Sequence, residues 1–179
     1  MIVRIPSVIC VVLVLAAASI ASAQEAPSMS PASRQLAYFV GRWQVETTTE
    51  QAQGASAAAV AVQDVAWLEG TSFLVMRPEG GTLPENSARL AILGYDPRER
   101  VYTADFFISP DARLSMTGLV TGSRWTWLSR DGQFRQTIQV LSPSSYTFQF
   151  ARSRGTVGWL TVSEGKAVKI GHDQADHQP

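Results

Sequence analysis

The residues that could carry out catalysis are few in this sequence. Both of its histidines, His172 and His177, lie in a polar C-terminal tail, and its one cysteine, Cys10, lies in an apolar stretch near the N-terminus. A Ser-His-Asp or Cys-His catalytic system therefore has no histidine inside the expected fold. The chain also has no G-x-S-x-G motif, and the pair Gly80-Gly81 has no helix after it that could bind a phosphate. These features argue against nucleophilic and phosphate-loop chemistry.

The tail histidines are also poor candidates for a metal or haem site. Asp173 and Asp176 stand beside them and could help to hold a surface ion. His172 follows the last expected strand closely enough to be considered as an axial haem ligand. A solvated tail is the simpler interpretation of both histidines. We therefore expect no metal and no cofactor.

Asp105 is the carboxylate whose position bears most on function. In its expected strand it alternates with Tyr102 and Phe106, so it points either into a polar part of the interior or outward. Inside, it would orient a ligand and pair with a cation such as Arg89, Arg113 or Arg124. Outside, it would form a surface ion pair, which is the simpler interpretation. An enzyme that used this interior would take Asp105 and Tyr102 as its acid–base groups.

Aromatic side chains offer a second kind of site. Several fall on strand faces that are expected to point inward, where they either fill a core or line a pocket for an apolar ligand. If they line a pocket, the residues in contact with the ligand would be Trp125, Trp127, Tyr146, Phe148, Phe150 and Trp159, together with Tyr102 and Asp105.

The elements that hold these side chains are predicted to be short antiparallel strands. Ser30-Pro31 is typical of a helix start, so a short helix is expected over 32–40, ended by Gly41. Beyond it, side chains alternate in period two, and tight turns such as Asp131-Gly132 separate the strands. A change of parity in the second strand predicts a bulge near Gln63-Asp64. The chain is expected to end in a strand over 156–162 and a short one over 167–170.

Nine or ten strands joined by short turns predict an all-β fold. A meander of this length has to close or divide into two sheets, because exposed edges aggregate. We expect an antiparallel up-and-down β-barrel of about 8–10 strands over 33–170, with a short N-terminal helix. A β-sandwich is the alternative, although the short hairpin loops favour the barrel.

The N-terminus is typical of an exported protein. Arg4, an aliphatic stretch and Ala21-Ser22-Ala23 form the three parts of a signal peptide over 1–23, with cleavage between Ala23 and Gln24. The aliphatic stretch is short for a membrane anchor, which is the alternative. We expect a flexible linker over 24–32, a disordered tail over 171–179, and a periplasmic or secreted location without a membrane span after cleavage. Lys and Arg number 15, as do Asp and Glu, and no basic run suggests nucleic acid.

An ordered series of short motifs resembles a bacterial family of uncharacterised, secreted lipocalin-like domains. The series runs over about 34–162 and comprises Leu36 with Phe39-Val40-Gly41-Arg42-Trp43, Trp67-Leu68-Glu69-Gly70, Leu93-Gly94-Tyr95-Asp96-Pro97 and Trp125-Thr126-Trp127. The resemblance implies a barrel but no established activity. It also implies that Trp43 plugs the closed end of the barrel beneath a cation from a late strand, with Arg152, Arg154 and Lys166 as candidates.

Together these features predict an exported, non-catalytic barrel that binds a small, largely apolar ligand in an aromatic-lined interior. Two alternatives remain open at this point. One is an enzyme that uses the same interior with a carboxylate or tyrosine as acid–base group. The other is an interaction module whose loop over 78–87 meets another protein of the cell envelope.

Overall fold

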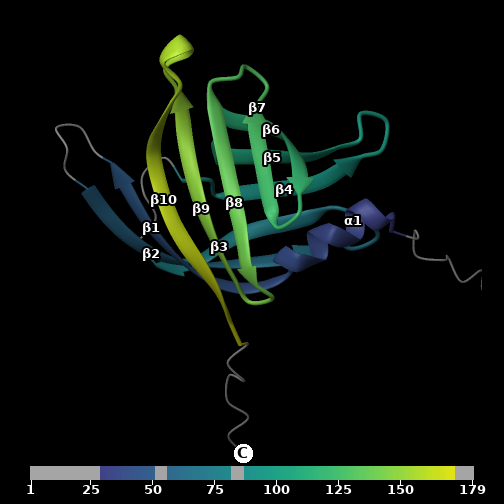
Figure 1. Ribbon diagram of the computed structural model, residues 1–179. Coiled ribbons are helices and arrows are strands. Elements are labelled where there is room, and N and C mark those ends of the chain that lie inside the picture. Colours follow the sequence, from purple (N-terminus) through teal and green to yellow (C-terminus); the bar gives the residue numbers. More distant parts are fainter. Residues whose placement is uncertain (1–28, 51–55, 82–86, 172–179) are drawn as a thin grey trace, which may run out of the picture.

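A computed structural model describes residues 29–50, 56–81 and 87–171 (Figure 1). Two short helical segments, α1 (Pro31–Gln35) and η1 (Leu36–Phe39), precede the strands, and a third, η3 (Gly155–Val157), lies late in the chain. The strands are β1 (Gly41–Glu50), β2 (Ser56–Trp67), β3 (Leu74–Gly81), β4 (Leu90–Asp96), β5 (Val101–Ser109), β6 (Ala112–Thr121), β7 (Arg124–Ser129), β8 (Phe134–Ser142), β9 (Ser145–Ser153) and β10 (Trp159–Ile170).

The ten strands form one closed antiparallel barrel. Each strand pairs with its neighbours in the chain, and β1 pairs with β10 to complete the circle. The up-and-down barrel with a short N-terminal helix is therefore confirmed, and the β-sandwich alternative is excluded. Because the barrel is closed, each of these ten strands has a paired neighbour on both sides, and the shortest pairing joins β3 to β4 over Leu74, Val75 and Met76 of β3.

The helical segment begins as the sequence predicts, but it is not one continuous α-helix. The Oγ of Ser30 accepts a 3.0 Å hydrogen bond from the backbone N–H of Ser33, with Pro31 in the first turn. The helix tightens to a 3₁₀ turn from Leu36 onward. The side chains of Leu36 and Phe39 are fully buried, so this segment closes one end of the barrel with apolar groups.

Trp43 lies beneath the helical segment at this closed end. Its Nε1–H donates a 2.7 Å hydrogen bond to the carbonyl of Phe39, and the residue is only 1% exposed. A cation does cover the ring, but it is Lys169, whose Nζ lies 5.0 Å from the ring centroid. The prediction of Arg152, Arg154 or Lys166 is wrong in this respect. The register explains it, because Trp43 faces Lys169 directly across the β1–β10 pair, whereas Lys166 faces Glu46.

Two expectations about strand irregularities need correction. Alternation in β2 is continuous: Ala61 and Val65 are buried, and Val60 is exposed. The predicted bulge does fall opposite Gln63, but the extra residue, Glu79, belongs to β3. The two strands expected at the C-terminal end are one long strand, β10, with an irregularity between Thr161 and Ser163.

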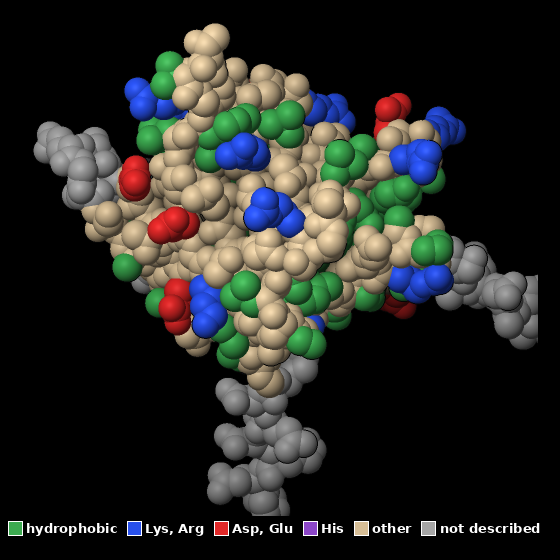
Figure 2. Space-filling view, in the orientation of Figure 1, with side chains coloured by type: hydrophobic (Ala, Val, Ile, Leu, Met, Phe, Trp, Pro, Cys, Tyr) green, Lys and Arg blue, Asp and Glu red, His purple; other side chains and the backbone are tan. Residues whose placement is uncertain are grey.

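Several expectations concern residues outside the described ranges. These are the signal peptide with its cleavage site, most of the linker, both tail histidines and the centre of the loop over 78–87. Among the described helices, none has both the length and the apolar character needed to cross a membrane. On the face shown in Figure 2, positive and negative side chains lie scattered among uncharged ones and do not gather in one field.

Candidate functional site

A cavity of about 280 Å³ lies inside the barrel. Large side chains form one part of its wall, namely Phe106, Trp127, Tyr146, Phe148 and Phe150. Small side chains form another part, namely Thr47, Ala59, Ala61, Ala88 and Ala91. A barrel of ten strands is wider than one that its own side chains just fill, and the small residues leave part of this extra space empty.

The cavity wall is almost without charge. No Asp, Glu, Lys, Arg or His is present among the described residues that line it. The described lining residues carry neutral polar groups, namely the hydroxyls of Thr47, Ser87, Ser163 and Tyr146, the side-chain amides of Gln63 and Gln136, and the indole N–H of Trp127. Burial, and to a smaller extent Tyr38, raises the pKa of the Tyr146 phenol well above its ordinary value, so this group is neutral as well. An apolar wall with a few neutral polar groups suits an uncharged ligand.

Four of the residues predicted to contact a ligand line this cavity: Trp127, Tyr146, Phe148 and Phe150. Trp125 and Tyr102 are buried in the same core but belong to the layer next to the helical segment. Their ring centroids lie 4.8 Å apart, and the hydroxyl of Tyr102 donates a 2.6 Å hydrogen bond to Oε1 of Gln35. These two residues thus join the cavity wall to the closed end.

Trp159, by contrast, lies on the outside of the barrel, where it is 37% exposed. The guanidinium of Arg135 lies 4.6 Å from its ring centroid. The expected inward position was wrong because of the irregularity in β10. Thr161 pairs with the outward Ala151, whereas Ser163 pairs with the inward Phe150, so the strand reverses its alternation between them. Residues of odd number therefore point outward before Val162 and inward after it.

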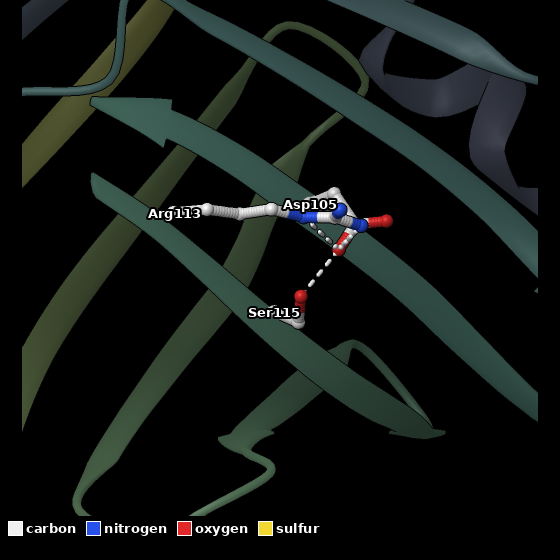
Figure 3. A network of polar contacts seen from close by, with 3 residues as sticks. All are labelled: Asp105, Arg113 and Ser115. Carbon is white, nitrogen blue, oxygen red and sulfur yellow. Dashed lines mark hydrogen bonds and ion pairs between the residues drawn. The ribbon is translucent and has the colours of Figure 1, made fainter. Parts of the chain in front are cut away.

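Asp105 also lies on the outer face, because it alternates in β5 with the buried Tyr102 and Ala104, and Figure 3 shows its contacts with Arg113 and Ser115. One of its carboxylate oxygens accepts a 2.6 Å hydrogen bond from the hydroxyl of Ser115 and lies 2.7 Å from a guanidinium nitrogen of Arg113. This is the surface ion pair that the sequence allowed as one of two alternatives. Because Tyr102 points inward from the same strand, the two groups considered for acid–base chemistry lie on opposite faces of β5.

The surroundings of Asp105 change the pKa of its carboxyl. Partial burial acts to raise the pKa of the carboxyl, but the hydrogen bond from Ser115 and the hydrogen bond and charge of Arg113 outweigh it, with a further contribution from Arg130. The net effect lowers the pKa of Asp105 below its ordinary value. A carboxyl whose pKa is lower in the folded than in the unfolded state adds stability above the unfolded pKa, and this stability is lost as the pH falls through the folded value.

Asp105→Asn is therefore expected to cost about 0.5 kcal/mol of unfolding free energy near neutral pH, the usual size for a half-exposed pair. Urea unfolding of both proteins near neutral pH and at a pH below the lowered pKa of Asp105 would measure the difference, which should vanish in acid because the unmodified carboxyl is then protonated. An equal loss at both pH values would show that the ion pair contributes nothing and that the substitution acts by another route.

Sequence reasoning missed the small-residue part of the wall. Ala59 and Ala61 point inward from β2, and Ala91 points inward from β4. The sequence feature that could have predicted this part of the wall is the series of alanines at alternate positions of β2, because their short side chains face aromatic residues on later strands. Gln136 was missed as well, although it has the same parity as Ile138 in β8.

Comparison with known proteins supports the fold. No protein-family model matches the sequence, and no curated protein matches it. Among solved structures, the S-type phycobiliprotein lyase CPES from Guillardia theta is similar, with a TM-score of 0.53 and 16% identity over 80% of this chain and 94% of that one. A redesigned β-barrel is similar at a TM-score of 0.36 and 14% identity, over 77% of this chain and 96% of that one. The barrel is thus supported by a natural protein of similar fold, while membership of the bacterial secreted family stays a prediction.

Proposed function

We propose that this protein is a non-catalytic carrier or receptor barrel that binds one small, uncharged, largely apolar ligand in its interior. The observation that carries the proposal is the cavity of about 280 Å³, with aromatic and aliphatic walls and no ionised group among its described lining residues. Its volume is close to the lower end of the range for small-molecule pockets, about 300–1,000 Å³. The ligand is accordingly expected to be of the size of a two-ring molecule.

The proposal includes export, on the evidence of the N-terminal sequence alone. The charged, aliphatic and small-residue parts of 1–23 fit a cleaved signal peptide, and we propose that the barrel acts in the periplasm or outside the cell. The likeness to the phycobiliprotein lyase supports the barrel architecture of the proposal and leaves the ligand open.

The structure gives less support to the two alternatives. An enzyme using Asp105 and Tyr102 would need both groups in one space, yet Asp105 is paired with Arg113 outside the barrel. The phenol of Tyr102 is bonded to Gln35 at the closed end, and burial, with Tyr95 adding to it, raises its pKa. The alternative of an interaction module was based on the loop over 78–87. Pro78 of this segment instead lines the cavity.

Filling the cavity from its small-residue wall should abolish binding. Ala59→Phe projects a ring into the space that the ligand would occupy, so affinity for an uncharged naphthalene probe is expected to fall at least about tenfold. Titration followed by tryptophan fluorescence would measure it, because Trp127 lines the cavity. Ala58→Phe is the matched control, since Ala58 is exposed on the outer face of the same strand. Equal probe affinity in both variants and the unmodified protein would place binding outside the cavity and refute the proposal.

A further inference from the structure

Trp127 holds a hydrogen-bond donor that the fold leaves unused. The residue is 2% exposed, and its Nε1 is buried without an acceptor among the described residues. By comparison, the equally buried indole of Trp43 donates to the carbonyl of Phe39. Nearly all buried polar groups in proteins have a partner, and each exception calls for an explanation. Trp127 also lines the cavity, so a ligand that displaces the atoms now covering Nε1 can supply the missing acceptor.

The indole of Trp127 is held in a fixed position. Its six-membered ring covers Gly118 on the neighbouring strand β6, where an added Cβ would lie 2.5 Å from Cε3 of the ring. Trp125 stacks against it as well, with centroids 6.0 Å apart and planes inclined by 13°. A ring fixed in this way has little freedom to turn toward another acceptor in the protein. A bound ligand would therefore have to place its acceptor at the position of the indole N–H.

Gln136 supplies a second polar group beside this ring. It faces Trp127 directly in the register of β7 and β8, and both residues line the cavity. Directly opposed side chains on one face of an antiparallel pair lie within reach of each other. The amide of Gln136 carries two N–H donors and one acceptor, so an oxygen placed near this pair could accept from both side chains.

We propose that Trp127 and Gln136 together form the polar recognition point of the cavity. The ligand is then an uncharged apolar molecule with an accepting oxygen, such as a ketone, an aldehyde or an ester. The inference rests on the proposed function and adds to it the chemical class of the ligand. Because the described residues of the wall include no cation, a carbonyl oxygen suits this point better than a carboxylate.

Two probes of nearly the same shape test the inference: 2-acetylnaphthalene and 2-isopropenylnaphthalene, which differ in having C=O or C=CH₂ at one position. Trp127→Phe and Gln136→Leu each remove the polar group from the wall. Each is expected to weaken the ketone about tenfold and the hydrocarbon less than about threefold, because only the ketone loses a hydrogen bond. Gln149→Leu is the control, since Gln149 is exposed on the outer face of β9, and it should change neither affinity.

An NMR titration of the unmodified protein gives an independent readout. The indole N–H signal of Trp127, assigned by its loss in Trp127→Phe, is expected to move downfield with the ketone and to stay nearly unmoved with the hydrocarbon. If both probes bind and the two variants weaken them equally, the recognition point is wrong while the proposed function stands. If neither probe binds the unmodified protein, the proposed function fails and this inference fails with it.

Discussion

Replacing Trp43 with alanine is expected to remove about 4 kcal/mol of unfolding free energy, within the range for a fully buried aromatic residue. Trp43 is 1% exposed, and its ring centroid lies 4.9 Å from that of Tyr146, which lines the cavity. The substitution also removes the hydrogen bond to Phe39 and the ring beneath Lys169, so the closed end loses its centre. Urea unfolding followed by far-UV circular dichroism measures the change.

Trp159→Ala is the control for this prediction, because it deletes the same side chain from the outer face of the barrel. Trp159 is 37% exposed, and the guanidinium of Arg135 lies over its ring. The expected loss is about 1 kcal/mol, close to the value of an exposed cation–π contact with some apolar burial. Equal losses in the two variants would contradict the view that Trp43 holds the closed end together.

The fold could be predicted because its strands depend mainly on local pattern. Alternation places every second side chain on one face whatever the rest of the chain does, and turn residues such as Asp131-Gly132 set the hairpins. Closure of the barrel followed from the number of strands. Bulges were less predictable, since they depend on the pairing of two strands. For this reason Trp159 was expected inside, and the extra residue of the first bulge was assigned to the wrong strand.

The site was only partly predictable for a related reason. Large inward residues such as Trp127 and Phe148 can be identified from parity, because alternation alone determines their face. Empty space cannot be identified in this way. It arises where small residues such as Ala59 on one strand face large ones on strands far along the chain. Likewise, the choice of Lys169 as the cation over Trp43 depends on the register of the first strand with the last. The residue pattern of a single strand determines neither the distance between facing strands nor the register in which two strands pair.

The uncharged wall predicts strong discrimination between neutral and anionic ligands of the same size. At neutral pH 2-naphthoate is ionised, and the described lining residues offer no cation to replace its hydration. The acid can then enter only at the cost of desolvating the anion or of taking up a proton. Since a carboxylic acid has a pKa near 4, either route should weaken its binding at least about 100-fold relative to 2-acetylnaphthalene.

Titrating the unmodified protein with these two compounds, from neutral pH down to about pH 5, tests the central claim most directly. The expected result is tight binding of the ketone at every pH, together with weak binding of the acid that strengthens about tenfold for each unit by which the pH falls. Binding of the acid at neutral pH within about threefold of the ketone would contradict an uncharged cavity, and absence of binding by both compounds would contradict a ligand-binding barrel.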